Sequence, residues 1–259
     1  MRFPNYQDKY QHDSALTAED VLNYRAQLGR LPRIPPPDGV ILCLQKGLPE
    51  RRRIRWQHPY RHAGKLMGDL LLLKKMHGKV AVLTNFGIGA PLVAALAEEL
   101  IAFGVKRLIA MSWAGGLQPD LQPGDIVVCD QAIRDEGTSH HYLPATKHIQ
   151  ASPALVQALA TTLTNHGHDC TIGTTWTTDA PYRETREEIR RYQSEGVKTV
   201  EMESAALFAV GQARGVPTAS VLVVGDSLAN LRWQAPPDVN PVERALEAVY
   251  AAAIEVLNQ

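Results

Sequence analysis

Six short runs rich in apolar and β-branched residues recur along the chain. Such runs are typical of strands that are buried on both faces of a sheet. Helix-like segments lie between several of them, and this alternation predicts a mostly parallel or mixed sheet covered by helices on both faces. The runs span residues 39–44, 79–84, 107–112, 125–130, 198–202 and 218–224. Folds of this α/β class bind small ligands in crevices at the strand ends.

Three of the predicted helices have recognisable ends. The segment 90–104 stops at Gly104, a residue suited to a left-handed cap. The segment 152–167 opens with Ser152 as N-cap and Pro153 at the first helical position, and it closes at Gly167. The pair Asn240-Pro241 opens the last helix in the same way, and an apolar stripe along that helix predicts packing on the sheet.

The first 38 residues form a polar lead-in that ends in a proline cluster, PRIPPPDG, where regular helix is precluded. The chain has 259 residues, of which 45% are hydrophobic and 21% charged, enough for one large core. We therefore predict a single α/β domain over residues 39–259. The lead-in, residues 1–38, is expected to lie at an oligomer interface.

The charge balance argues against nucleic acid and membranes as partners. Lys+Arg and Asp+Glu both total 27, so no global field attracts a polyanion, and an anionic ligand must be held locally. Three widely spaced cysteines without a CxxC motif (Cys43, Cys129, Cys170) indicate reduced core residues of a cytoplasmic protein. The polar start and the absence of a long apolar run predict neither secretion nor membrane insertion.

Two carboxylates flank a methionine where a predicted strand becomes a helix, in the segment VEMESAALFAV. Glu201, Met202 and Glu203 would then lie at the end of the sheet, where a carboxylate can bind the hydroxyl groups of a polyol. Acidic residues are also favoured in the first turn of a helix by its dipole. The spacing alone leaves both interpretations open.

Two glycine-containing turns follow other predicted strands. The turn TNFGIGAP, residues 84–91, could present backbone N–H groups to a ligand. Leu92 stands where a dinucleotide fingerprint needs its third glycine, so a nicotinamide-dependent dehydrogenase is disfavoured and a plain strand–helix turn is favoured. The second turn contains Ala114-Gly115-Gly116, a surface that lets backbone approach a ligand and that equally serves turn geometry.

Charged residues follow two further strands. The segment QKGLPERRRIR, residues 45–55, carries four arginines, whose planar forks suit phosphate, although such runs are also typical of a solvated surface. Asp226 ends the strand 218–224, where partial burial would raise the pKa of its carboxyl and allow it to donate a proton. The alternative is that Asp226 caps the segment that follows it.

No metal site or covalent nucleophile is predicted. The pairs His140-His141 and His166-x-His168 lack the spacing and partner ligands of a zinc site. Neither a G-x-S-x-G elbow nor a papain-like cysteine context occurs.

Taken together and in order, these segments resemble the nucleoside phosphorylase family, in particular its uridine phosphorylase-like and hexameric purine nucleoside phosphorylase branch. The resemblance runs from about residue 12 to the C-terminus, and its strongest pieces are VEMESAALFAV, VVGDSLA and TNFGIGAP. It implies a twisted mixed sheet, partly barrel-like, flanked by helices. It also implies an enzyme without a metal or organic cofactor that transfers a ribosyl group from a nucleoside to inorganic phosphate, and that forms a homodimer or homohexamer.

The resemblance also implies roles for single residues. Glu203 resembles the ligand of the ribose hydroxyls, with Glu201 beside it and Met202 under the sugar. Asp226 resembles the aspartate of the purine branch that protonates the base, and this favours purine nucleosides. Tyr182 and Arg183 fall where the family contacts the base, and His12 resembles a histidine that reaches the sugar across a dimer interface. The implied phosphate ligands are Gly47, Arg51, Ala114 and Gly115.

The implied phosphate site departs from the family pattern. In KGLPER, Leu48 replaces the aspartate of the family's turn, and at the end of RLIAMSWAGG this chain has Ala110 and Trp113 where an arginine and a hydroxyl residue are usual. Three functions are therefore predicted for testing: a nucleoside phosphorylase, a nucleosidase that uses water, and an inactive nucleoside-binding homologue.

Overall fold

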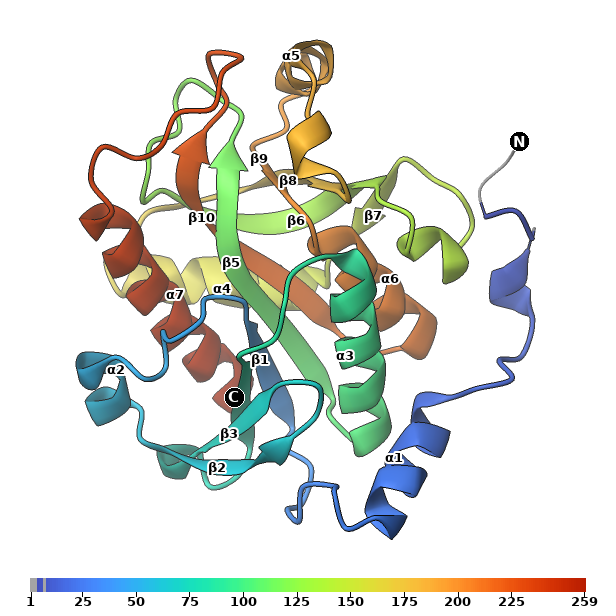
Figure 1. Cartoon of the computed structure of the whole chain (residues 1–259). Coiled ribbons are helices and arrows are strands. Elements are labelled where there is room, and N and C mark those ends of the chain that lie inside the picture. Colours follow the sequence, from blue (N-terminus) through green and yellow to red (C-terminus); the bar gives the residue numbers. More distant parts are fainter. Residues whose placement is uncertain (1–3, 7) are drawn as a thin grey trace.

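A computed structural model describes residues 4–6 and 8–259, and residues 1–3 and 7 of the predicted lead-in lie outside the described part. The described chain forms one α/β unit with ten strands and seven α-helices. The strand order is β10-β6-β8-β9-β5-β1-β4-β3-β2, with β7 beside β6 (Figure 1). The mixed sheet and its flanking helices confirm the predicted fold class.

The open part of the sheet is built around buried parallel strands. β1 (Gly39–Cys43) lies between β4 (Val80–Thr84) and β5 (Arg107–Gly116) and is parallel to both. Every residue of β1 and β4 is buried, as expected for strands that are covered on both faces. β3 (Asp69–Leu73) and β2 (Tyr60–Lys65) extend this part as antiparallel strands at the edge.

The remaining strands close into a barrel. From β5 the ring runs through β9 (Thr199–Glu201), β8 (Cys170–Thr178), β6 (Ile126–Asp135) and β10 (Thr218–Ser227), and β10 pairs with β5 again. β7 (His148–Gln150) is the added strand on β6. Five strands therefore form a closed ring that shares β5 with the open sheet, and the partly barrel-like sheet that the resemblance implied is present.

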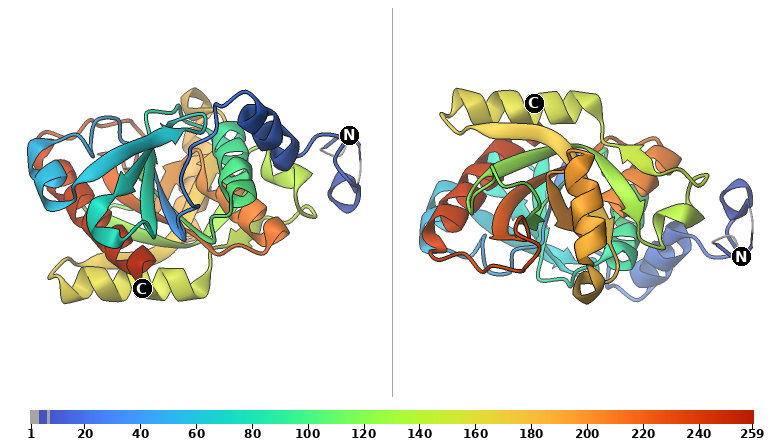
Figure 2. Two further views of the ribbon diagram at one scale, coloured as in Figure 1. Left: turned by 90° about the horizontal axis from the view of Figure 1, so that it is seen from below. Right: turned by 90° about the horizontal axis from the view of Figure 1, so that it is seen from above.

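Helices cover both faces of this sheet. α3 (Ala90–Phe103) packs between α1 (Ala18–Gln27) and α6 (Ser204–Arg214), whereas α4 (Pro153–Asn165) packs against α7 (Asn240–Asn258). Figures 1 and 2 show α3 and α6 on one side of β5 and α7 on the other. α5 (Arg186–Ser194) covers the barrel end, where its Ile189 and Tyr192 pack on Trp176 and Val200, and α2 (Arg52–Gln57) lies outside the sheet.

All six predicted strands are present, and β5, β6 and β10 continue beyond the predicted runs. Gly104 ends α3 in the left-handed region with φ 111°, as predicted. Ser152 precedes α4 as predicted but makes no side-chain cap, and α7 begins at Asn240, with Val239 as N-cap. Four strands and three helices were not predicted: β2, β3, β7, β8, α1, α2 and α5.

The lead-in contains regular structure despite its prolines. α1 begins after a capping box in which the Asp20 backbone N–H donates to the Thr17 hydroxyl and the Asp20 carboxylate accepts from Thr17. A 3₁₀ turn, η1 (Lys9–Gln11), projects at the edge of the molecule (Figure 2). Within the described residues, no helix is long and apolar enough to cross a bilayer.

We expect Gly211→Ala to destabilise the fold because α6 approaches β10 closely at this point. A Cβ atom at Gly211 would lie 2.4 Å from Cγ2 of Thr218 and 2.8 Å from the carbonyl oxygen of Val216. Overpacking of this kind costs about 1–3 kcal/mol of unfolding free energy, measurable by urea denaturation. Ala213→Ser, at an exposed position of the same helix, is expected to change stability by less than about 0.5 kcal/mol. Equal stabilities of the two variants would contradict this account of the close approach.

Candidate functional site

The candidate site lies where one edge of β5 is open. β1 pairs with β5 as far as Met111, and β9 begins to pair with β5 only at Gly115. Between these points, among the described residues, Ser112, Trp113 and Ala114 pair only with β10 on the other side of β5. Gly47 and Arg51 follow β1, Met202 and Glu203 follow β9, and Asp226 lies near the end of β10, so the open edge is the place where ligand contacts would be expected.

The Glu201 carboxylate stabilises the start of α6. One of its oxygens accepts hydrogen bonds from the backbone N–H groups of Glu203 and Ser204, each at 2.8 Å, and from the Ser204 hydroxyl at 2.9 Å. The other oxygen accepts from the Thr177 hydroxyl of β8 at 2.6 Å. These four hydrogen bonds use both oxygens of the buried carboxylate. Glu201 therefore fits the interpretation in which an acidic residue stabilises the start of the helix, rather than the one in which it binds a polyol.

Glu203 is buried as well, with 4% of its surface exposed, but protein groups occupy it less fully. Oε1 accepts from the backbone N–H of Gly89 at 2.6 Å, and Oε2 accepts from the backbone N–H of Met202 at 3.2 Å. Burial, and then the neighbouring Glu201 charge, raise the pKa of Glu203 to about 7. Glu203 therefore retains acceptor capacity for a ligand, and the half-buried Met202 lies beside it.

The glycine turn before α3 contacts Glu203 directly. Gly89 has φ 105° and Asn85 has φ 59°, so the turn uses the left-handed region twice. Because the Gly89 N–H donates to Glu203, this turn positions a carboxylate. No dinucleotide fingerprint is needed to explain its glycines.

A β-bulge positions Asp226 at the end of β10. Val224 pairs with Ala114 and Asp226 pairs with Gly115, so Gly225 is the extra residue. A Cβ atom at Gly225 would lie 2.9 Å from the Trp113 ring, and one at Gly115 would lie 3.1 Å from Oδ1 of Asp226. Burial raises the pKa of the Asp226 carboxyl, while a hydrogen bond with the Trp233 side chain opposes this rise. The half-buried acid that the sequence predicted is therefore present.

A second carboxyl group near Asp226 was not predicted. Burial, followed by the charges of Asp226 and Glu188, raises the pKa of Glu184 to about 7. Within the described part of the chain, no hydrogen bond or ion pair engages the half-buried Glu184 carboxyl. The T-x-x-E capping box of α5, formed by Thr185 and Glu188, is the sequence signal that would have placed Glu184 just outside a helix.

The residues predicted to bind phosphate have mixed environments. Gly47 has φ 74° and open space around the position of a Cβ atom. Arg51, however, makes an ion pair in which its Nη2 lies 2.9 Å from Oε1 of Glu243 in α7. Ala114 and Gly115 belong to β5 itself rather than to a loop. The predicted anion site thus contains an arginine that is already paired.

Three predicted ligand contacts lie on the surface of the chain. Tyr182 is 99% exposed in the 3₁₀ turn η4 (Pro181–Arg183), and Arg183 is exposed beside it. His12 is exposed in the lead-in, with its ring edge-on to Tyr6 at 5.8 Å between centroids. The structure of the single chain does not bring these side chains into contact with Glu203.

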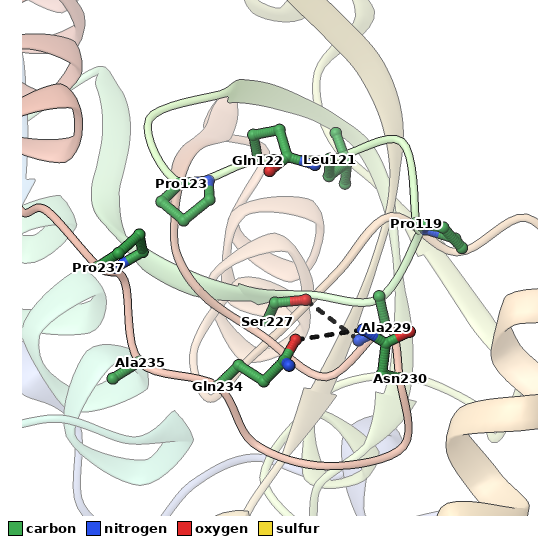
Figure 3. A pocket seen from close by; sticks show the side chains of 10 residues that line it. All are labelled: Pro119, Leu121, Gln122, Pro123, Ser227, Ala229, Asn230, Gln234, Ala235 and Pro237. Atoms are coloured by element: carbon green, nitrogen blue, oxygen red, sulfur yellow. Dashed lines mark hydrogen bonds between the residues drawn. The ribbon is translucent and has the colours of Figure 1, made fainter.

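A separate pocket of about 330 Å³ opens beside the residue that follows Asp226 (Figure 3). Prolines and amides dominate its lining, which includes Pro119, Gln122, Ser227, Asn230 and Gln234. Hydrogen bonds within the lining join Ala229 N–H to the Ser227 hydroxyl and Asn230 to Gln234 (Figure 3). None of the described residues that line this pocket is charged, so it lacks the carboxylates of the candidate site. Among the described residues, no group of three or more His, Cys, Asp or Glu side chains is placed to hold a metal ion.

Comparisons with known proteins agree on one family. A model of the phosphorylase superfamily matches residues 42–258. The chain is 30% identical over 186 residues to a guanosine phosphorylase of Halorubrum lacusprofundi, an alignment that covers 70% of this chain and 76% of that relative. It is 26% identical over 201 residues to a uridine phosphorylase of Haemophilus influenzae, with 71% and 79% covered.

A solved structure agrees with the fold. The crystal structure of an AMP nucleosidase from Bacteroides thetaiotaomicron superposes with a TM-score of 0.72 and covers 93% of this chain and 97% of that chain. Its sequence identity to this chain is 24%, so this likeness concerns the fold alone.

We expect Glu203→Gln to remove a pH-dependent part of the stability. The folded state raises the pKa of this carboxyl from 4.5 to about 7, so its contribution is fully present below about pH 4.5 and is lost as the pH rises through about 7. Between about pH 5 and about pH 8, the wild type should therefore lose about 1–3 kcal/mol more unfolding free energy than the variant.

Urea denaturation at both pH values measures this difference. Glu187→Gln makes the same chemical change at a side chain that is 80% exposed, and it should follow the wild type. Parallel pH profiles for the wild type and Glu203→Gln would show that Glu203 titrates normally in the fold.

Proposed function

The chain belongs to the phosphorylase superfamily, as its resemblance predicted, and on that premise we propose that it is a nucleoside phosphorylase acting on purine nucleosides. The observation that carries the proposal is that Gly115 of β5 pairs with Asp226 on one side and, on the other, with Val200, three residues before the buried Glu203. The reaction would release the free base and form ribose 1-phosphate.

Glu203 is proposed to bind the sugar. Cleavage of an N-glycosidic bond builds positive charge on the ribose, so a carboxylate that accepts hydrogen bonds from the 2′ and 3′ hydroxyls also stabilises the transition state. The Gly89 and Met202 N–H groups hold this carboxylate in place, and Glu201 fixes the helix start from which it projects. Met202 would pack under the sugar, and His12 of a second copy would reach its 5′ end.

Asp226 is proposed to protonate the departing base. Its half-buried carboxyl has a raised pKa, which favours a proton donor near neutral pH. Glu184, whose pKa is raised in part by the charge of Asp226, is a candidate for a further contact to the base. Tyr182 would stack on the base and Arg183 would contact its edge. The preference for purines rests on Asp226, and the name of the Halorubrum lacusprofundi relative, guanosine phosphorylase, agrees with it.

Phosphate would be the second substrate, held by Arg51, the Gly47 turn and the backbone N–H groups of Ala114 and Gly115. It would attack C1′ of the ribose as the bond to the base breaks, and no metal or organic cofactor takes part in this scheme. We place the enzyme in the cytoplasm as a homodimer or homohexamer, since three free cysteines suit a reducing compartment and His12 would act across an interface.

A hydrolytic nucleosidase is the second candidate function. It is favoured by one observation, the pairing of Arg51 with Glu243, together with Leu48 and Ala110 at positions where the family's phosphorylases have phosphate ligands. With Arg51 engaged, water would be the available nucleophile. The two functions make different predictions for the role of phosphate.

We expect purified protein to release base from inosine, guanosine or adenosine faster than from uridine, and only when phosphate is present. Chromatography of the products separates the free base and identifies the ribose 1-phosphate that phosphorolysis must form. Equal rates with and without phosphate would instead establish the nucleosidase. Nucleoside binding by calorimetry without release of any base would exclude both enzymes.

We expect Asp226→Asn to lower kcat/KM for purine nucleosides by about 10²-fold or more, because an amide cannot donate a proton to the leaving base. Uridine, or a nucleoside whose base leaves without protonation, should lose much less. Initial rates for both substrate types give this ratio. A uniform loss for all substrates would assign Asp226 a structural role at the end of β10.

A further inference from the structure

One ion pair joins the proposed phosphate turn to the C-terminal helix. Nη2 of Arg51 lies 2.9 Å from Oε1 of Glu243, and the two residues are 192 positions apart in the sequence. Arg51 is the N-cap residue of α2, and Glu243 lies in the first turn of α7. The arginine that would bind phosphate is therefore held by a carboxylate from the far end of the chain.

A second, similar pair lies one turn further along α7. Nη1 of Arg53 is 3.7 Å from Oε2 of Glu247. Both pairs join α2 to α7, but only Arg51 belongs to the KGLPER turn, where Gly47 leaves open space and the neighbouring Leu48 side chain is buried in the core. Glu247 thus provides a matched position at which a carboxylate pairs with an arginine outside the proposed phosphate site.

The geometry of the first pair makes it a competitor for anions. A guanidinium offers a planar fork of donors that fits a carboxylate and a phosphate in the same way, so one fork cannot fully serve both. The side chains of Arg51 and Glu243 are 36% and 41% exposed. A pair exposed to this degree is screened by water and is only weakly held, so a second anion can displace it.

We infer that Glu243 competes with phosphate for Arg51 and thereby sets how tightly the site binds its phosphate nucleophile. This inference rests on the proposed function, since it assigns Arg51 to phosphate. In the resting protein a Glu243 oxygen accepts a hydrogen bond from Nη2 of Arg51, so phosphate can use both arms of the guanidinium fork only when it displaces that carboxylate. At low phosphate concentration the exchange is unfavourable and turnover is slow.

The test compares the full-length wild type with Glu243→Gln. The amide removes the negative charge but keeps the size of the side chain, so Arg51 is freed for phosphate. We expect KM for phosphate to fall about 2- to 5-fold, with KM for the nucleoside changed less than about 1.5-fold. Glu247→Gln should leave both values as in the wild type. An unchanged KM for phosphate in Glu243→Gln, or an equal fall in Glu247→Gln, would overturn the inference.

A double variant tests whether the effect passes through Arg51. Removal of a negative charge can attract phosphate to any nearby cation, so Arg51→Met/Glu243→Gln is compared with Arg51→Met alone. If Glu243 acts through Arg51, Glu243→Gln should not lower KM for phosphate in a protein that already carries Arg51→Met. A KM for phosphate that is lower in the double variant than in Arg51→Met alone would refute the role of Arg51.

A binding measurement separates this inference from the proposed function. Calorimetric titration with inorganic phosphate needs no turnover, so it applies even if the wild type proves to be a nucleosidase and phosphorolysis is rejected. Phosphate binding that is at least about 2-fold tighter in Glu243→Gln than in the wild type supports the inference in either case. Equal binding, with both proteins folded by circular dichroism, contradicts it whatever the reaction is.

Discussion

The hydrogen bonds around the Glu201 carboxylate hold the candidate site together. They connect the Thr177 hydroxyl of β8, the end of β9 and the first N–H groups of α6, so three elements meet at one buried charge. Hydrogen bonds to both oxygens lower the cost of burying this carboxylate, but burial remains the larger effect and raises the pKa of Glu201. Glu203 projects from the backbone that this network fixes and accepts a hydrogen bond from Gly89, so the orientation of the Glu203 carboxylate depends on its neighbour Glu201.

Burial away from water sets the pKa values of the carboxyl groups in the candidate site. Burial is the first cause of the raised pKa values of Glu203, Asp226 and Glu184, and the charge of a neighbouring carboxylate adds to it at Glu203 and Glu184. A group of this kind can accept or donate a proton near neutral pH. Close approach of backbone makes this burial possible, since glycines at 115 and 225 leave room for Asp226 and Trp113.

Local pattern in the sequence predicted the buried strands, because β1, β4 and β10 each contain an unbroken run of apolar residues. The same pattern did not predict β8, a barrel strand in which threonines replace many of the apolar residues. It also did not predict β2, which is largely exposed at the sheet edge. Of the site, the strand-end acids at 203 and 226 were predicted. The ion pair between Arg51 and Glu243 was not predicted, because it depends on where α7 packs in the fold. No local sequence pattern indicates that position.

The closure of the barrel by β10 on β5 has a consequence for how the protein is made. Asp226 gains its neighbours only when β10 joins a strand that left the ribosome much earlier, and α7 can cover the sheet only after that. Pairings between such distant parts of a chain form late and slowly. A nascent or truncated chain that lacks β10 would hold an exposed, unpaired β5 edge, so chaperones would have most to protect until β10 is made.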